Sequence, residues 1–382
     1  KKFDDVPFVV KFPDGEEFKV GEGEPQAIIR ANGGIDMGAV MKSPSLALGE
    51  AYMDKTLELE KGDLFEILNM VLAKLEDFAS DFSGLTKIMK TSTSKKNQKQ
   101  EIATHYDIGN EFFELWLDET MSYSCGYFKH ETDTLYDAQV HKVEHILKKL
   151  NLKEGQTLLD IGCGWGYLLI AAAKKYHVKG VGITLSEEQY KKGQERIKAE
   201  GLEGQVEIRL MDYRDLEKSG MTFDRIVSVG MLEHVSRDNY PLFFKNIDKV
   251  LNKKGIVLLH YISGRQEHDG DPWIKKYIFP GGIIPSLREI IYLIGEYNYY
   301  TLDVESLRRH YEKTLLEWSK NYAAKRDVID TMFEERFVRM WELYLVSCAS
   351  VFHNGICDIH QILFTKGVDN DLPMTRNYLY ED

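Results

Sequence analysis

The sequence has 382 residues, enough for one large domain or two ordinary ones, so core size sets no limit. Hydrophobic residues make up 43% and charged residues 29%, which are ordinary proportions for a soluble globular protein. The formal net charge of −12 argues against a general nucleic-acid-binding protein and against attraction of the whole surface to anionic lipid. Any contact with a membrane must therefore be local.

The four cysteines, Cys125, Cys163, Cys348 and Cys357, show neither the CxxC spacing of a metal site nor the spacing of a disulfide framework. We expect reduced thiols in the cytoplasm and no bound metal. Residues 1–5 carry charges where a signal peptide has its apolar segment, so we expect no such peptide. No apolar run approaches the roughly 20 residues that a membrane-spanning helix needs.

The first 86 residues predict a small α+β domain. Strands are expected over 8–12, 18–20 and 27–29, and apolar residues at helical spacing predict helices over 46–53 and 64–75. This region contains no catalytic constellation. We therefore expect it to pack, to dock on another surface or to mediate dimerisation.

Residues 87–99 carry five lysines and no acidic residue, with small polar residues in the middle. This composition predicts a flexible linker. It is also compatible with a cationic patch beside anionic lipid, which contributes at best about 1 kcal/mol per lysine. Helices are predicted next over 111–117 and 137–150. The stretch between them, 121–128, mixes aromatic, hydroxyl and thiol side chains, a combination that is typical of a pocket wall.

From residue 155 the predicted strands and helices alternate regularly. Strands are expected over 158–161, 178–183, 206–211, 225–229, 256–261, 300–304 and 359–364. Helices are expected over 166–176, 186–200, 240–251, 287–295, 306–324 and 332–351. This order predicts an α/β fold with a doubly wound, mostly parallel sheet of seven strands. In such sheets ligands bind beyond the carboxyl ends of the strands.

The most informative stretch is 157–166, TLLDIGCGWG, which predicts a buried strand that breaks into three glycines before a helix begins. Gly162, Gly164 and Gly166 leave backbone N–H groups open to a ligand. Their spacing is shorter than the dinucleotide fingerprint, and Asp160 favours a ligand with a positive centre or a donor-rich amino-acid part. S-adenosylmethionine (SAM) fits these features better than NAD. A purely structural turn is the alternative.

Polar and aromatic residues follow the next two strands. Ser186 is a good helix N-cap with Gln189 at the capping-box position, and Thr184 and Gln189 can also bond the ribose or the amino-acid part of the ligand. Asp212 can accept a hydrogen bond from an adenine amine, and Tyr213 can cover the ring.

Two titratable residues end the fourth and fifth strands. Glu233 follows an apolar run, where a carboxylate needs a partner or a raised pKa. His234 is adjacent to Glu233, and neighbouring residues on a helical turn face different directions, so we assign His234 a structural role. His260 ends an apolar strand; a satisfied core histidine is the alternative, but its place at the ligand-binding edge favours function.

Between about 263 and 299 an apolar, aromatic and proline-bounded insertion interrupts the alternation. We expect it to form a lid over the strand ends, which suits a long hydrocarbon substrate. Packing into the core is the alternative.

Four separated motifs together resemble those of cyclopropane-fatty-acyl-phospholipid synthases. They are LDIGCGWG at 159–166, GITLS at 182–186, YSCGYF at 123–128 and IFPGG at 278–282. The resemblance covers about residues 98–382. Residues 1–90 resemble the extra N-terminal domain of the bacterial phospholipid enzymes, which the related mycolic-acid enzymes lack. This favours phospholipid as the substrate.

The resemblance implies a fold, an oligomeric state and a cellular location. It implies a Rossmann-like SAM-methyltransferase domain over 100–382, joined through the linker 87–99 to a lipid-docking or dimerisation domain over 1–86. It also implies a homodimer in the cytoplasm, peripherally associated with the inner face of the cell membrane.

The resemblance also implies a reaction. The SAM methyl is transferred to a cis double bond of a phospholipid acyl chain, a proton leaves, and a cyclopropane ring closes. Bound bicarbonate is the implied base, in a cradle formed by Cys125 (through its backbone), Glu233, His260, the backbone of Ile262, and Tyr311. The implied SAM contacts are Tyr106, Tyr123, Ser124, Gly162, Gly164, Thr184, Gln189, Asp212, Tyr213 and Val229. Cys348 matches a family cysteine once suspected as a nucleophile, although its mid-helix apolar setting favours an inert thiol.

Two alternatives to this reaction stay open. One is a SAM-dependent methyltransferase that acts on a soluble acceptor. The other is a lipid-binding module that keeps a relict SAM fold.

Overall fold

The computed structural model describes residues 7–79 and 108–380, with the side chains of 74–79 left out. The chain divides into two compact units. Of the described residues, the first unit combines 7–79 with two later segments, 270–280 and 315–356. The second unit holds the rest, including the predicted sheet. The linker predicted over 87–99 lies outside the described residues. The two later segments of the first unit were not predicted, because their partners are distant in the sequence.

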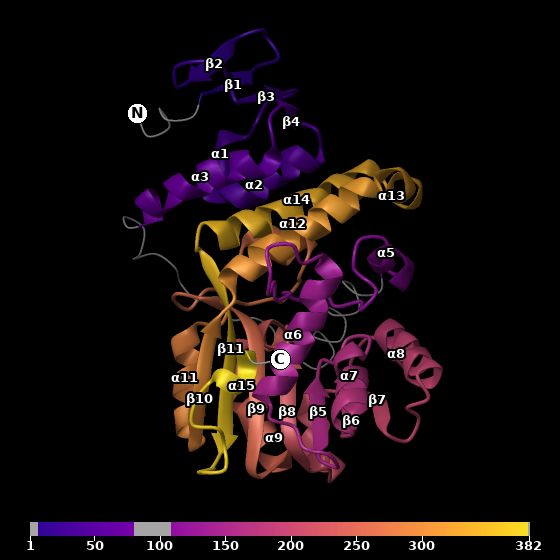
Figure 1. Cartoon of the computed structure of the whole chain (residues 1–382). Helices are drawn as coiled ribbons and strands as arrows, with labels where there is room; N and C mark the ends of the chain where they lie inside the picture. The colour runs from indigo at the N-terminus through magenta and orange to yellow at the C-terminus, as the bar shows by residue number, and fades with distance from the viewer. Residues whose placement is uncertain (1–6, 80–107, 381–382) are drawn as a thin grey trace. The chain divides into compact units, whose positions relative to one another are not determined.

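The second unit is built on a seven-stranded sheet in the order β10-β11-β9-β8-β5-β6-β7 (Figure 1). In this order the strands are β10 (Tyr299–Ser306), β11 (Cys357–Lys366), β9 (Leu251–Gly264), β8 (Phe223–Val229), β5 (Thr157–Ile161), β6 (Lys179–Thr184) and β7 (Val206–Leu210). β11 runs antiparallel to both of its neighbours, and the other neighbouring pairs are parallel. The predicted doubly wound sheet of seven strands is therefore confirmed.

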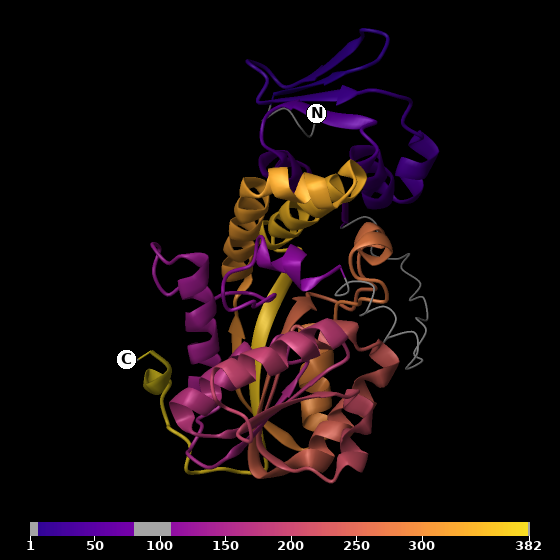
Figure 2. The ribbon, with the colours of Figure 1, turned by 90° about the vertical axis from the view of Figure 1, so that its right-hand side faces the viewer.

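Helices cover both faces of this sheet (Figure 2). One face packs against α6 (Leu135–Lys149), α7 (Tyr167–Tyr176) and α8 (Glu187–Ala199), through a core that includes Ile146, Leu169 and Ile197. The other face packs against α9 (Tyr240–Val250) and α11 (Leu287–Glu296), through a core that includes Phe244 and Ile290. These two layers fix the carboxyl ends of the strands, where the site is expected.

The remaining helical elements of this unit are short or begin at its border. They are α5 (Asn110–Glu114), the 3₁₀ turns η1 (Tyr213–Ser219), η2 (Leu232–His234) and η3 (Arg237–Asn239), the start of α12 (Arg308–Ala324), and α15 (Asn377–Tyr380).

The first unit contains a four-stranded sheet in the order β2-β1-β3-β4. Its strands are β1 (Phe8–Lys11), β2 (Glu17–Val20), β3 (Ala27–Ala31) and β4 (Leu57–Lys61). Its helices are α1 (Met37–Lys42), α2 (Pro44–Met53), α3 (Leu64–Ala79), α10 (Pro272–Tyr277), α13 (Arg326–Met332) and α14 (Glu335–His353). The three predicted strands and two predicted helices are confirmed. α1 and β4 were missed, because one is a six-residue helix and the other, LELEK, is rich in charge.

The insertion predicted as a lid divides between the two units. Its helix α10 packs on α2 within the first unit, where the Trp273 ring fills the space that a Cβ on Gly49 would need. Tyr277 donates from its hydroxyl to Glu50 at 2.6 Å. Residues 287–296 form α11, whose Ile290 belongs to the core of the second unit. The lid prediction is therefore wrong for α11 and stays a prediction for 270–280.

None of the helices within the described ranges is long and apolar enough to cross a membrane.

A substitution of Phe244 tests how much core packing stabilises the second unit. Its ring is fully buried and stacks on Phe364, with 6.1 Å between ring centroids. We expect Phe244→Ala to lower the free energy of unfolding by about 3–5 kcal/mol, through lost apolar burial and the cavity left behind. Urea denaturation followed by circular dichroism measures this. Tyr292→Ala on α11, where the side chain is 66% exposed, is the control, and an equal loss there would contradict the assignment of the core.

Candidate functional site

The turn after β5 is the backbone frame of the site. Gly162, Gly164 and Gly166 all have positive φ angles, of 84°, 54° and 83°. A Cβ on Gly162 would approach Met231 to 2.9 Å, so a side chain there would be both strained and crowded. The N–H groups of Gly162 and Cys163 both donate to the carbonyl of Ile183 at the end of β6. The glycines therefore let the turn close against the neighbouring strand before α7 begins.

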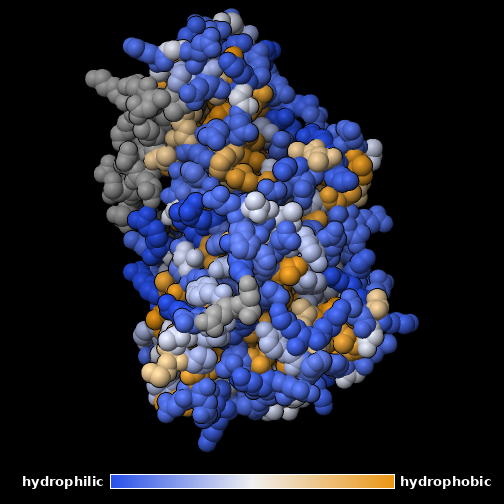
Figure 3. Space-filling model, in the orientation of Figure 1, coloured by the Kyte–Doolittle hydropathy of each residue, from blue (hydrophilic) through white to orange (hydrophobic). Residues whose placement is uncertain are grey.

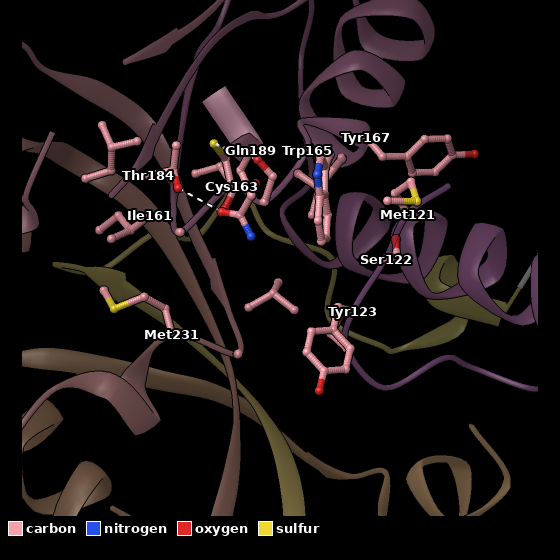
Figure 4. A pocket seen from close by; sticks show the side chains of 18 of the residues that line it. Met121, Ser122, Tyr123, Ile161, Cys163, Trp165, Tyr167, Thr184, Gln189 and Met231 are labelled. Carbon is pink, nitrogen blue, oxygen red and sulfur yellow. Dashed lines mark hydrogen bonds between the residues drawn. The ribbon is translucent and has the colours of Figure 1, made fainter. Parts of the chain in front are cut away.

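A pocket opens beside this turn (Figure 4). Its walls come from the ends of β5, β6 and β8, from the start of α7, and from the predicted pocket-lining stretch. The implied SAM contacts that line it are Tyr123, Ser124, Gly162, Gly164, Thr184, Gln189, Tyr213 and Val229. Tyr106 lies outside the described residues. The pocket thus brings together implied contacts that are far apart in the sequence.

Thr184 and Gln189 form a buried pair at one wall. The Thr184 hydroxyl donates to Gln189 Oε1 at 2.8 Å, drawn as the dashed line in Figure 4. Ser186 caps α8 as predicted, because its side chain accepts from the Gln189 N–H. The prediction of a capping box is wrong, since the Gln189 side chain bonds Thr184 and does not return to the cap. This bond occupies Oε1 and orients the amide nitrogen toward the pocket (Figure 4).

Asp212 has local partners of its own. Its carboxylate pairs with Arg214 at 2.6 Å from Nη2 and 2.9 Å from Nε, and it also accepts from the Arg214 N–H as the cap of η1. Asp212 is not among the residues that line the pocket. Its implied contact with adenine therefore stays a prediction, while the neighbouring Tyr213 does line the pocket.

Two buried charged side chains line the pocket. Asp160, 3% exposed on β5, has a carboxylate oxygen, Oδ1, without a hydrogen-bond partner, and burial raises its pKa to about 7. Lys142, also 3% exposed, projects from α6 and donates to Ser124 Oγ at 2.9 Å. Burial lowers the pKa of Lys142 to about 8. Sequence reasoning missed Lys142, although it shares the apolar helix face of Val143 and Ile146, where a lysine is unexpected.

The segment 121–128 is held by hydrogen bonds from two helices. Gln139 of α6 donates to the carbonyl oxygens of Ser124 at 2.9 Å and Ser122 at 3.3 Å. The Gly126 N–H donates to the Thr314 hydroxyl of α12 at 3.0 Å. These bonds explain how an irregular stretch forms a defined pocket wall.

Stacked rings hold the end of the same segment. The Tyr127 ring lies between the imidazoles of His145 and His310, with ring-centroid distances of 4.4 Å and 4.8 Å. The Phe128 N–H also donates to His310 Nδ1 at 3.0 Å.

The implied base cradle has Glu233 and His260 at its centre. Glu233 Oε1 accepts a hydrogen bond from the Ile262 N–H at 2.7 Å. The other carboxylate oxygen, Oε2, is buried without a partner. Burial raises the pKa of Glu233 to about 7. His260 lies two residues before Ile262 on β9, and its Nδ1 is 3.1 Å from the Gln361 amide nitrogen. Its Nε2 is also buried without a partner. Burial, assisted by the positive charge of Lys142, lowers the pKa of His260 to about 3, so the ring is neutral.

The contacts given for Cys125 and Tyr311 run through Leu307, and their implied places in the cradle stay predictions. The Cys125 sulfur lies 3.8 Å from the carbonyl oxygen of Leu307, and burial raises the pKa of its thiol. Leu307 also accepts from the Tyr311 N–H and donates to Ile359, which pairs with Ile262 across β11 and β9. The structure thus joins Glu233 to Ile262 by a hydrogen bond and places His260 two residues before Ile262 on β9. Cys125 and Tyr311 are linked to them through Leu307.

Cys348 lies on α14 of the first unit, and its implied role stays a prediction. Within the ranges that the structure describes, no group of three or more His, Cys, Asp or Glu side chains could hold a metal ion.

The raised pKa of Glu233 has a consequence for stability. Its value of about 7 lies above the ordinary value of 4.5, so the folded protein holds this proton more tightly than the unfolded chain. The stability that this proton contributes is complete below the unfolded pKa and is lost as the pH rises through the folded pKa. Glu233→Gln cannot lose a proton. We therefore expect its free energy of unfolding, relative to the native protein, to rise between about pH 5 and about pH 8.

Urea titrations at several pH values measure this difference. Glu154→Gln, at an exposed turn, is the matched control, and we expect its difference from the native protein to stay constant. If the difference in free energy of unfolding between Glu233→Gln and the native protein also stayed constant with pH, the Glu233 carboxyl would not be held in a protonated, buried state.

Comparison with known proteins matches both parts of the chain. Residues 93–362 match the family described as mycolic acid cyclopropane synthetase, and residues 1–83 match a domain family of unknown function. A probable fatty acid methyltransferase of Pseudomonas putida is 39% identical, over 98% of this chain and 96% of its own length. The cyclopropane-fatty-acyl-phospholipid synthase of Escherichia coli K12 is 40% identical, over 93% of this chain and 92% of its own length.

Solved structures agree with these matches. A mycolic acid cyclopropane synthase complexed with S-adenosylhomocysteine (SAH) and CTAB is similar with a TM-score of 0.66 and 34% identity, over 70% of this chain and 98% of that one. The cyclopropane synthase MmaA2 of Mycobacterium tuberculosis is similar with a TM-score of 0.66 and 31% identity, over 72% of this chain and 100% of that one. The chain therefore belongs to the mycolic acid cyclopropane synthetase family of SAM-dependent methyltransferases.

Proposed function

We propose that the enzyme transfers the methyl group of SAM, as a methylene, across a cis double bond of a phospholipid acyl chain, which gives a cyclopropane ring. The observation that carries this proposal is that Glu233 Oε2 and His260 Nε2 are both buried without partners beside the pocket. Glu233 precedes His234 of the pocket wall, and the His260 carbonyl accepts from the N–H of Gly230, which also lines the pocket. A neutral His260 ring and the Glu233 carboxyl can hold a small oxyanion there, and that oxyanion would receive the proton that leaves after methyl transfer.

The residues of the pocket suit a reaction with a weak nucleophile. Because an alkene attacks poorly, the reacting carbons must be aligned with the sulfonium in a site without water. Tyr123 packs against Phe113 and Trp116, with ring centroids 5.5 Å and 5.4 Å apart. Such aromatic faces exclude water and can stabilise the positive charge that develops on the acyl chain.

We propose bicarbonate as the group that occupies the cradle, where it would supply the base for the departing proton. The residues present fit a small oxyanion with one hydroxyl. Because the Gln361 amide donates to Nδ1, the neutral His260 ring carries its proton on Nε2 and can donate it. Glu233 Oε2, which is buried without a partner, can share a proton with an oxygen of the anion. The Ile262 N–H holds Glu233 in place at 2.7 Å.

We also propose that the enzyme acts as a homodimer at the inner face of the cell membrane. The visible face in Figure 3 is mostly hydrophilic, so contact with lipid must be local. The first unit exposes large apolar side chains that can make such contact: Phe12, Phe18, Met37, Met41 and Leu48. The E. coli phospholipid enzyme matches this part of the chain as well, because the similarity covers 93% of the sequence.

Activity measurements on variants test the proposed role of the base cradle. We expect Glu233→Gln and His260→Ala each to lower cyclopropane formation on vesicles of unsaturated phospholipid by about 100-fold or more, because each removes a group that holds the proposed bicarbonate base. Mass spectrometry of the acyl chains measures the product, and calorimetry checks that SAM still binds. Tyr292→Ala is the surface control.

Normal turnover in both variants would remove the cradle from the mechanism. Equal turnover of free small acceptors and vesicles would favour a methyltransferase for soluble substrates. No binding of SAM at high concentration would favour the lipid-binding module.

The lipid contact is tested by sedimentation. Met37 and Met41 are 63% and 83% exposed on α1, which has no buried residue. We expect Met37→Ser with Met41→Ser to reduce co-sedimentation with phospholipid vesicles several-fold, because apolar area that would enter the lipid is removed. Val328→Ser with Met332→Ser, also at exposed positions of this unit, is the control. Equal sedimentation of all three proteins would place the lipid contact elsewhere.

A further inference from the structure

Lys142 is a buried cation in the wall of the SAM pocket. Its side chain shares a face of α6 with Gln139 and Val143, and it is 3% exposed. Among the described residues no ion pair within 4.0 Å is found for its ammonium group, and its hydrogen bond goes to Ser124 Oγ at 2.9 Å. The carboxylates of Asp118 and Asp160 attract it from farther away, but burial still lowers its pKa, so the chain alone does not offset the cost of burying this charge.

Asp160 presents the opposite charge in the same pocket. Its Oδ1 is buried without a partner, and it makes no ion pair with Lys142 among the described residues. The two groups are close enough to influence each other, since the attraction of Lys142 opposes the rise in the pKa of Asp160. A pocket with a buried cation and a buried anion that do not pair with each other matches a zwitterion.

SAM carries such a zwitterion at its amino-acid end, with an α-ammonium and an α-carboxylate. We propose that Lys142, together with the Ser124 hydroxyl, binds the α-carboxylate of SAM, while Asp160 binds the α-ammonium. Charge-assisted hydrogen bonds of this kind are stronger than neutral ones and more specific in direction. Gln139, which holds the Ser124 carbonyl at 2.9 Å, is then a positioning residue for the same contact.

This contact explains why a lysine occupies an apolar helix face. Fixing the amino-acid end of SAM also fixes the direction in which the sulfonium methyl points, because the two are joined by a short chain. The inference depends on SAM binding, and not on the lipid substrate proposed above.

The experiment compares two ligands by titration calorimetry: SAM, and decarboxylated SAM, which lacks the α-carboxylate and keeps the sulfonium. We expect Lys142→Met to weaken the binding of SAM by about 10- to 100-fold, which is the range for a hydrogen bond to a charged group. The same substitution should change the binding of decarboxylated SAM by less than about threefold. Ser124→Ala should show a smaller loss, again for SAM alone.

Lys153→Met, at an exposed position just after α6, is the matched control and should bind both ligands as the native protein does. Circular dichroism melting shows whether each variant folds. Equal losses for the two ligands in Lys142→Met would show that Lys142 only supports the structure. The native protein provides an independent test, because equal affinity for SAM and decarboxylated SAM would overturn the proposal even if the lysine variant fails to fold.

Discussion

The site depends on the cost of burying polar atoms that the chain itself does not satisfy. Asp160 Oδ1, Glu233 Oε2 and His260 Nε2 are all buried without partners, and all lie at or just beyond the carboxyl ends of neighbouring strands β5, β8 and β9. Native proteins leave few such atoms, because each one loses its hydrogen bonds to water. These three atoms lie near the edge of the sheet where ligands bind, so bound ligands can complete their hydrogen bonds.

The rest of the second unit keeps these atoms in place. The glycine turn sets the end of β5 against β6, and the Ile262 N–H fixes one oxygen of Glu233. Gln139 and Thr314 hold the irregular segment 121–128 from two sides. Neutral His260 and protonated Glu233 are both favoured by burial, and the neutral ring keeps a donor at Nε2. The scaffold therefore supplies direction and a dry environment, and the ligands supply the missing charges and acceptors.

Much of the fold could be predicted because its signals are local. The apolar runs and the glycines identified every strand of the large sheet, and Ser186 was recognised as a cap. Boundaries were less accurate where local signals conflict: β9 begins at Leu251, five residues before its predicted start, because Lys253, Lys254 and Gly255 interrupt the apolar run.

What sequence reasoning missed depends on contacts between distant residues. Lys142 looks like a surface lysine until α6 is seen to turn it inward toward Ser124. Sequence patterns do not encode side-chain rotamers. The ion pair of Asp212 with Arg214 and the hydrogen bond from Thr184 to Gln189 could therefore not be predicted. The packing of Trp273 against Gly49 joins residues more than 200 positions apart, so the division of the predicted lid between the two units could not be read from the sequence.

A crystal structure of the enzyme with SAH and bicarbonate tests the central claim most directly. The account predicts a planar anion bonded to both Glu233 Oε2 and His260 Nε2, and the amino-acid end of SAH bonded to Asp160 Oδ1. It would be contradicted if SAH bound in the pocket while these three atoms stayed bonded only to water, or turned toward partners within the protein.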